Sequence, residues 1–150
     1  MPLSTKPRYT GHFRHSLDDK NRLTIPSDWR HAHTEDDAFV ALPHPDGYIA
    51  ILPPSEVDRL YEKTAAKNLS DSEAQDVLTQ LFAFAQTLRF DKQGRFGLDP
   101  ELLAHAGVTK EAVLAGSLSK FAIWSPERWA AKGQKMDAQT YRDLMRRAGI

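Results

Sequence analysis

A short charged pattern occurs twice in the chain, and it constrains the fold more than any other feature. Asp18 and Arg22 stand four residues apart between apolar residues, and Asp91 and Arg95 repeat the arrangement 73 residues later. The two segments read Leu-Asp-Asp-Lys-Asn-Arg-Leu-Thr-Ile and Phe-Asp-Lys-Gln-Gly-Arg-Phe-Gly-Leu. Three further matches follow in the same order at an offset of 72 or 73. The repeat therefore predicts a duplicated unit of about 50 residues.

Each copy of the unit predicts the same succession of short elements. An extended stretch, 9–17 in the first copy, ends at the charged turn, where Asn21 or Gly94 can adopt a positive φ. Alternating apolar residues then predict a short strand, and a short helix follows. Two further strands complete each unit, at residues 38–42 and 48–52 and at residues 112–116 and 120–124.

Helical patterns follow both units, so the expected fold class is α+β, mainly β with helices after each unit. The expected organisation is a flexible N-terminal extension (1–8), a first unit (9–54), a helical connection (55–85), a second unit (86–129) and a C-terminal helical tail (130–150). No Gly/Ser-rich linker separates the units, which predicts that they pack into one body. Large aromatic residues are expected mainly in the core, with subunit interfaces as the alternative, namely Trp29, Trp124, Trp129, Phe82 and Phe84.

The distribution of charge leaves a nucleic-acid partner open although the formal net charge is zero. Residues 1–33 carry six basic residues against three acidic ones, and residues 34–80 carry three basic residues against ten acidic ones. A basic start and an acidic middle therefore persist inside a neutral total. Such asymmetry is also common on ordinary solvated surfaces, so charge alone leaves both interpretations open.

Several classes of protein are excluded by composition. No apolar run approaches the roughly 20 residues of a membrane span, and the first residues lack the apolar core of a secretory signal. The absence of cysteine excludes disulfides and thiolate metal sites and fits a reducing cytoplasm. The histidine pairs His12/His15 and His31/His33 lack a metal-binding pattern. With no catalytic motif present, we expect no enzyme, no cofactor, no metal and no small-molecule substrate.

The doubled turn resembles the MraZ family, a branch of the AbrB-like swapped-hairpin regulators. The resemblance extends from about Tyr9 to about Trp129, and it rests on residues 16–18, 20–26, 91–95, 105–111 and 119–124. It implies tandem duplicated AbrB-like units packed as one pseudo-twofold body. This chain departs from the family pattern at Asn21, where glycine is usual, and at Leu98-Asp99, which replaces the Ile-Pro of the first copy.

The resemblance also implies a function. It implies a sequence-specific transcriptional regulator of the bacterial division and cell-wall gene cluster, located in the cytoplasm at the nucleoid. Such a regulator would bind repeated short sites in its own promoter through basic turns of several subunits of a ring-like homo-oligomer. Two alternatives are an AbrB-like antitoxin and a ring-forming interaction module, each of which binds a protein partner.

The residues expected to contact double-stranded DNA are Lys20, Arg22, Arg14, Lys92 and Arg95. A two-stranded ribbon can enter the major groove, where arginine can bond a guanine edge or a phosphate. Asp18, Asn21, Asp91 and Gly94 are expected to shape the turns, because carboxylates that faced phosphates would repel them. The alternative for Arg22 and Arg95 is an internal ion pair with no DNA contact. We also expect both turns on one face and the acidic 55–76 region away from it.

Overall fold

The computed structural model describes residues 6–66 and 72–150 of the chain. Residues 1–5 of the expected N-terminal extension and residues 67–71 of the expected helical connection lie outside the described residues. The strands are β1 (His12–Ser16), β2 (Arg22–Thr24), β3 (Phe39–His44), β4 (Tyr48–Leu52), β5 (Gln86–Leu88), β6 (Arg95–Gly97), β7 (Glu111–Gly116) and β8 (Phe121–Trp124). The helices are α1 (Ser27–Arg30), α2 (Pro54–Ala66), α3 (Ser72–Ala83), α4 (Pro100–Ala106), α5 (Pro126–Gln134) and α6 (Ala138–Arg147).

The strands form two antiparallel sheets, which confirms the α+β class predicted from the sequence. Six strands are ordered β1-β7-β8-β4-β3-β5, and β2 pairs with β6 in a separate two-stranded ribbon. The first strand of each half thus pairs with the other half: β1 lies beside β7, and β5 lies beside β3. Exchanging the two halves of the chain, β1–β4 for β5–β8, reverses the order of the sheet and leaves it otherwise unchanged.

The register of these strand pairs is also preserved when the two halves of the chain are exchanged. His15 lies opposite Ala112 in the β1–β7 pair, and Leu88 lies opposite Phe39 in the β5–β3 pair. Adding 73 to the positions of His15 and Phe39 gives those of Leu88 and Ala112, so one pair maps onto the other. The two halves meet at the centre of the sheet, where β4 and β8 pair.

The first strand is shorter than the sequence pattern indicates. The expected extended stretch of 9–17 contains β1 only from His12 to Ser16, because Gly11 has a φ of 86° that interrupts the strand. Before that break, Tyr9 forms an isolated antiparallel bridge with Leu118. The backbone of Tyr9 passes so close to Gly116 that a side chain there would collide with it.

One core joins both halves of the chain, as the absence of a linker predicts. Leu23 of β2 and Phe96 of β6 are fully buried in the same cluster as Ile49, Ile51 and Ile123 of the large sheet. Large apolar side chains buried in this way contribute roughly 1.5–3 kcal/mol each. The two-stranded ribbon is therefore fixed against the six-stranded sheet, and this position determines where its turns point.

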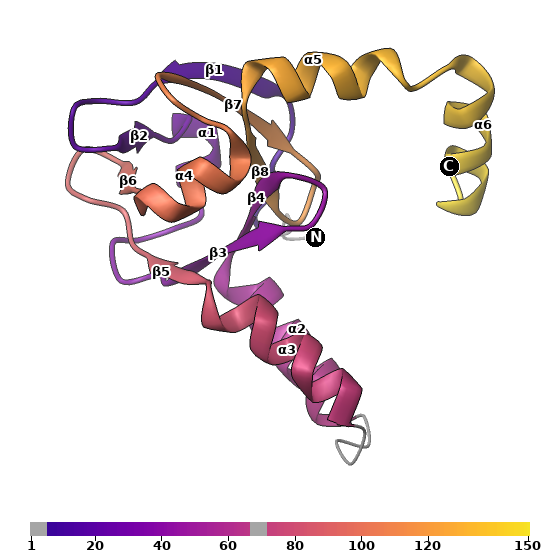
Figure 1. Cartoon of the computed structure of the whole chain (residues 1–150), viewed down its shortest axis with the longest axis horizontal. Coiled ribbons are helices and arrows are strands. Elements are labelled where there is room, and N and C mark those ends of the chain that lie inside the picture. The colour runs from indigo at the N-terminus through magenta and orange to yellow at the C-terminus, as the bar shows by residue number, and fades with distance from the viewer. Residues whose placement is uncertain (1–5, 67–71) are drawn as a thin grey trace, which may run out of the picture.

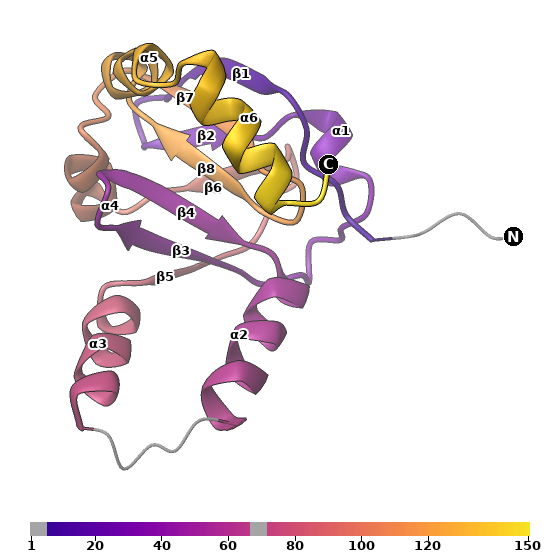
Figure 2. The same ribbon diagram turned by 90° about the vertical axis from the view of Figure 1, so that its right-hand side faces the viewer.

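Helices α1 and α4 contribute Trp29, Leu102, Leu103 and Ala106 to this core, whereas α2, α3, α5 and α6 lie outside it. Helices α2 and α3 pack on β3 and extend as a protruding pair, while α5 packs on β7 and carries α6 away from the body (Figures 1 and 2). The core prediction is wrong for Phe82 and Phe84, which are 38% and 59% exposed, because the last turn of α3 and the residue after it lie outside the core cluster. Trp29 and Trp124 are buried as predicted, and Trp129 is half-buried.

Within the described ranges, no helix has the length and apolar character of a membrane span.

Candidate nucleic-acid interface

The two charged turns lie next to each other because β2 and β6, which follow them, are paired. Arg22 lies opposite Gly97, and Thr24 lies opposite Arg95. The backbone N–H of Ile25 donates to the Gly94 carbonyl at 3.0 Å, and that of Leu98 donates to the Asn21 carbonyl at 3.0 Å. Each turn is thus tied to the strand that leaves the other. The turns lie at one end of the molecule, away from α6 and the α2–α3 pair (Figure 1).

Asp18 organises the first turn from within. Its Oδ1 accepts hydrogen bonds from the backbone N–H groups of Lys20 and Arg22 at 2.9 and 2.8 Å. Its Oδ2 accepts one from Arg22 Nε at 2.6 Å. The backbone hydrogen bond from Arg22 is the largest of the effects that lower the pKa of Asp18 below its ordinary value of 3.8. Asp18 is therefore a negatively charged acceptor that shapes the loop.

Asp91 makes the same set of contacts in the second turn. Its Oδ1 accepts from the backbone N–H groups of Gln93 and Arg95, both at 2.9 Å, and its Oδ2 accepts from Arg95 Nε at 2.8 Å. Burial alone would raise the pKa of Asp91, but the hydrogen bonds from Arg95 and Gln93 outweigh it and lower that pKa. The two turns share one hydrogen-bond pattern.

A left-handed residue closes each turn. Asn21 has a φ of 59° and Gly94 a φ of 75°, and their N–H groups donate to the carbonyls of Asp18 and Asp91. Asparagine is among the few residues with a side chain that adopt this conformation routinely. The backbone of the first turn is therefore kept although its sequence has no glycine there.

The four charged side chains form a connected network. Besides its bond to Asp91, Arg95 reaches Asp18 Oδ2 with Nη1 at 3.5 Å. Arg22 pairs with Asp18 through Nε, and its side chain is 33% exposed, whereas that of Arg95 is 22% exposed. Two arginines and two aspartates together carry no net charge. The internal ion pair that the sequence left open therefore exists, and it neutralises much of the positive charge of the turns.

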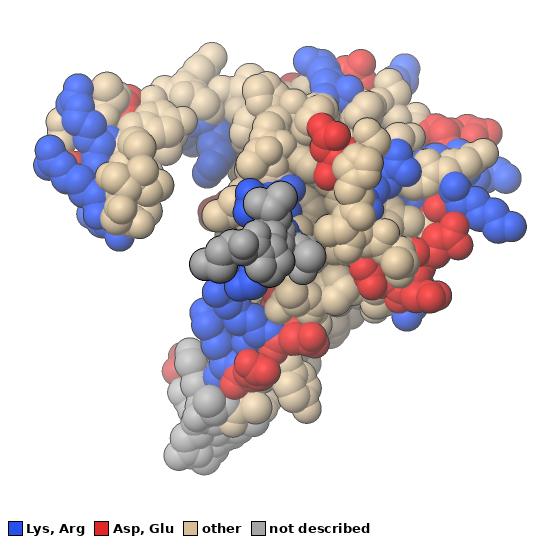
Figure 3. Space-filling view, turned by 180° about the vertical axis from the view of Figure 1, so that it is seen from behind, with Lys and Arg blue, Asp and Glu red and all other residues tan. Residues whose placement is uncertain are grey.

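Lysines supply the remaining positive charge at the turns. Lys20 and Lys92 are exposed, and within the described residues neither forms an ion pair. Asp19, also exposed, stands in the first turn where Lys92 stands in the second. Figure 3 accordingly shows basic and acidic side chains side by side at this end of the molecule rather than a uniformly basic face.

Arg14 is separated from this network. It lies on β1, outside both turns, and its guanidinium forms an ion pair with Glu111 of β7 through Nη2 at 2.8 Å. A nucleic-acid contact by Arg14 would have to break or share that pair.

Sequence reasoning missed a further arginine that supports the second turn. Arg30 of α1 donates from Nε to the Ile25 carbonyl at 3.0 Å, and its guanidinium lies over Gly94 where a Cβ atom would stand. Nothing in the sequence near Arg30 indicates this contact, because it depends on the pairing of β2 with β6.

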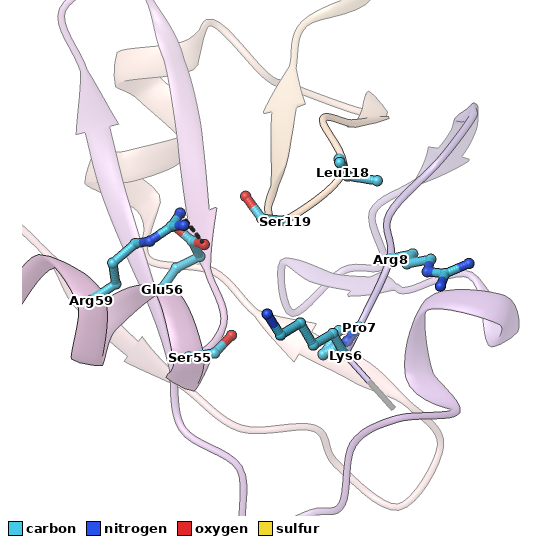
Figure 4. A pocket seen from close by; sticks show the side chains of 8 residues that line it. All are labelled: Lys6, Pro7, Arg8, Ser55, Glu56, Arg59, Leu118 and Ser119. Atoms are coloured by element: carbon cyan, nitrogen blue, oxygen red, sulfur yellow. Dashed lines mark hydrogen bonds and ion pairs between the residues drawn. The ribbon is translucent and has the colours of Figure 1, made fainter. Parts of the chain in front are cut away.

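Two further polar features lie outside the turns. His33 has a buried side chain that links the Tyr9 hydroxyl to Asp37 Oδ2. No group of three or more potential metal ligands occurs among residues 6–66 and 72–150. A cleft of about 450 Å³ at the start of α2 contains Lys6, which extends toward Ser55 and Ser119, while Arg8 points away (Figure 4).

Comparison with known proteins gives consistent matches along nearly the whole chain. A family model described as "MraZ protein, putative antitoxin-like" matches residues 81–147. The transcriptional regulator MraZ of Thermomicrobium roseum is 37% identical over 131 residues, covering 87% of this chain and 91% of the relative. That of Heliobacterium modesticaldum is 33% identical over 136 residues, covering 91% and 93%. That of Clostridium acetobutylicum is 30% identical over 143 residues, covering 95% and 99%.

Proposed function

Since the chain belongs to the MraZ family of transcriptional regulators and is therefore not an enzyme, we propose that it binds double-stranded DNA through its paired turns. The observation that carries this proposal is the pair of exposed lysines, Lys20 and Lys92, at the tips of two turns that one ribbon holds side by side. A two-stranded ribbon is narrow enough for the major groove. Unpaired lysines at its tips would meet the phosphates first.

The arginines of the turns have a second role in this proposal. Asp18 holds Arg22 by its Nε atom, and the two terminal nitrogens of that guanidinium form no hydrogen bond or ion pair within the described residues. A guanidinium that is held through Nε can still donate hydrogen bonds from its terminal nitrogens to a phosphate or to a guanine edge. The carboxylates thus hold the arginines in place, while the side chains of Asp18 and Asp91 are themselves 30% and 36% exposed.

The proposal includes a duplicated architecture. We infer two AbrB-like swapped-hairpin units at 9–54 and 86–129, related by a pseudo-twofold axis through the β4–β8 pair. Three observations support it: the reversible strand order, the register offset of 73, and the matched hydrogen bonds of the two turns. In this organisation the helical connection (55–85) and the tail (130–150) lie outside the DNA-binding body.

Assembly into a ring of several copies completes the proposed mode of binding. Only two lysines lie at the turns of each chain, and they give a weak, salt-dependent attraction, because each neutralised phosphate adds a modest increment. Several linked copies on repeated sites would raise the affinity sharply. The target that the family resemblance suggests is a set of short repeats in the protein's own promoter, ahead of the division and cell-wall genes, with the protein in the cytoplasm at the nucleoid.

The salt dependence of DNA binding tests this proposal. Binding to the DNA that precedes the protein's own gene is measured by fluorescence anisotropy at several salt concentrations. The Lys20→Ala/Lys92→Ala variant is expected to bind more weakly, and its log–log salt slope should fall by about 1.8 per bound subunit. The matched control is Lys63→Ala/Lys135→Ala, which loses the same charge from exposed positions on α2 and after α5. Equal slopes for the two variants would refute the assignment to the turns.

A second variant separates DNA contact from an internal role for Arg22. Arg22→Lys keeps the positive charge but loses the planar fork that Asp18 holds. Under the proposal it weakens binding to the promoter repeats more than binding to unrelated DNA. If the arginine serves the turn alone, thermal stability falls and both affinities change equally. If the wild-type protein does not bind DNA at all, the protein-interaction alternatives take the place of this function.

A further inference from the structure

Helix α6 presents an apolar face that nothing covers within the described residues. Tyr141, Leu144 and Met145 are spaced three and four residues apart on one side of the helix, and they are 54%, 43% and 45% exposed. The basic side chains occupy the other side, and Figure 3 shows them gathered away from the uncharged face. Aspartate at the N-cap, Asp137, accepts from the Thr140 N–H at 2.8 Å, so the helix begins at a defined point. An amphipathic helix of this kind is built to bury its apolar side.

A groove of matching character lies between α2 and α3. It has a volume of about 470 Å³ and an apolar lining that includes Leu60, Tyr61, Leu78 and Phe82. Tyr61 is 74% exposed and Phe82 is 38% exposed, so the groove is open to solvent. Helices of 13 and 12 residues are about 18–20 Å long, whereas the 10-residue α6 is about 15 Å long. The groove is thus long enough to receive α6 in the manner of a helix in a groove.

Charge favours this groove over a second open apolar surface of the described residues. Helices α2 and α3 together carry five acidic and two basic residues within the described ranges, whereas α6 carries three arginines and one aspartate. The exposed face of the large sheet also has an apolar hollow, of about 400 Å³, but Lys120 and Lys132 line it. A basic helix is attracted to the acidic pair and repelled by the lysines.

The α6 helix cannot reach the groove of its own chain. Only Lys135, Met136 and Asp137 separate α5 from α6, and three residues span at most about 11 Å. Figures 1 and 2 place α5 and the α2–α3 pair at opposite ends of the body, with the large sheet between them. The helix that fills the groove must therefore come from another molecule.

We propose that α6 of one copy of this chain docks, apolar face inward, into the α2–α3 groove of a second copy. The contact is heterologous, so each copy offers one helix and one groove, and repetition produces a closed ring or an open filament. The proposed function includes assembly of several copies, and this interface rests on that function in this respect alone. The interface identifies the surfaces through which the copies meet.

Single substitutions on each surface test the interface in the absence of DNA. Leu144→Glu places an acid on the apolar face of α6, and Tyr61→Glu places one in the groove. The controls, Gln139→Glu and Ala65→Glu, add the same charge at exposed positions of α6 and α2 that do not line the groove. Masses are measured by light scattering after size exclusion. The wild type and controls are expected to be multi-subunit, and each test variant is expected to shift to the 16.9 kDa single chain. Unchanged masses in both test variants, or a monomeric wild type, would overturn the proposal.

Mixing the two test variants gives the sharpest result. The Leu144→Glu chain keeps an intact groove, and the Tyr61→Glu chain keeps an intact α6, so together they can form one contact and no more. The expected product is a 1:1 species of twice the chain mass. Persistence of single chains in the mixture would show that the two surfaces do not meet, which would overturn the proposal.

A cross-link provides a readout that does not depend on loss of assembly. The chain has no cysteine, so a Tyr61→Cys/Leu144→Cys variant contains only the two thiols of interest. Oxidation is expected to produce disulfides between chains. A bond within one chain, or no bond, contradicts docking onto a second copy. Unchanged DNA binding in Lys20→Ala/Lys92→Ala would refute the proposed function, and an assembly mass that depends on Leu144 and Tyr61 would still leave this interface standing, so the two proposals can fail separately.

Discussion

Replacement of Gly94 by alanine is expected to lower the free energy of unfolding by about 2–4 kcal/mol. Gly94 has a φ of 75°, a conformation in which a Cβ atom is strained. The added methyl group would also point into the guanidinium of Arg30, which is anchored by its bond to the Ile25 carbonyl. The substitution therefore affects both the backbone of the turn and the arginine that covers it.

The magnitude is the sum of two effects. The left-handed conformation costs a residue with a side chain about 1–2 kcal/mol. Displacement of Arg30 gives up a hydrogen bond from a charged donor at 3.0 Å, and partial exposure of this arginine limits that loss to about 1–2 kcal/mol. For a chain of this length, the total corresponds to a fall in Tm of roughly 5–15 °C.

Urea unfolding followed by tryptophan fluorescence and circular dichroism measures the effect. Gly133→Ala is the matched control, since Gly133 lies in α5 with no atom within 4 Å of its added Cβ. The same chemical change is expected there to stabilise the protein slightly, by up to about 1 kcal/mol. The two substitutions should thus have opposite signs.

A double-mutant cycle with Arg30→Ala tests whether the Arg30 side chain opposes the new methyl group. If Arg30 opposes the new methyl group, removal of its side chain makes room, and the double variant should cost less than the two single costs together by about 1 kcal/mol. Additive costs would refute the role assigned to Arg30 and leave backbone strain as the only effect.

Three further outcomes are expected. Asp19→Lys removes an exposed acid from the first turn and should tighten DNA binding and steepen the salt slope by about 0.9 per bound subunit; unchanged anisotropy curves would contradict it. The lowered pKa of Asp18 and of Asp91 means that their stabilising contribution is complete above the ordinary value of 3.8 and is lost as pH falls through the folded-state pKa. The urea midpoint of Asp18→Asn/Asp91→Asn should therefore depend less on pH below about 4 than that of the wild type, and parallel profiles would argue against this. Tyr9→Phe leaves buried His33 without its hydroxyl partner and should cost about 1–2 kcal/mol in urea unfolding; a neutral effect would mean that the bond adds no net stability.

Local signals in the sequence predicted most of the elements. The strand expected at 48–52 is β4 as observed, because alternating apolar residues determine a strand locally. Ser125 caps α5 by accepting the Arg128 N–H at 3.1 Å, and serine followed by proline is a common local signal for the start of a helix. The partners of the strands were less accessible. Neither the residues of β1 nor those of the turn after it show that β1 pairs with β7. The pairing depends on contacts between residues far apart in the chain.

The site was predictable in its residues but not in its electrostatics. The spacing of Asp18 and Arg22 allowed either a DNA-facing arginine or an internal pair, and the structure contains the pair. The bond from Arg95 to Asp18 joins the two turns across 77 positions of sequence, and no local pattern encodes it. The sequence could therefore name the cations of the turns but not which of them remain unpaired.

The pairing of β2 with β6 gives this molecule a direction. Two identical chains joined as a dimer would present one turn twice and suit a palindrome. Here a single chain contains both turns, and the exposed Asp19-Lys20 of one differs from the Lys92-Gln93 of the other. The ribbon is therefore asymmetric along the DNA axis. Under the proposed function, copies that bind in the same orientation would match DNA sites repeated in the same orientation. An inverted site would be bound more weakly.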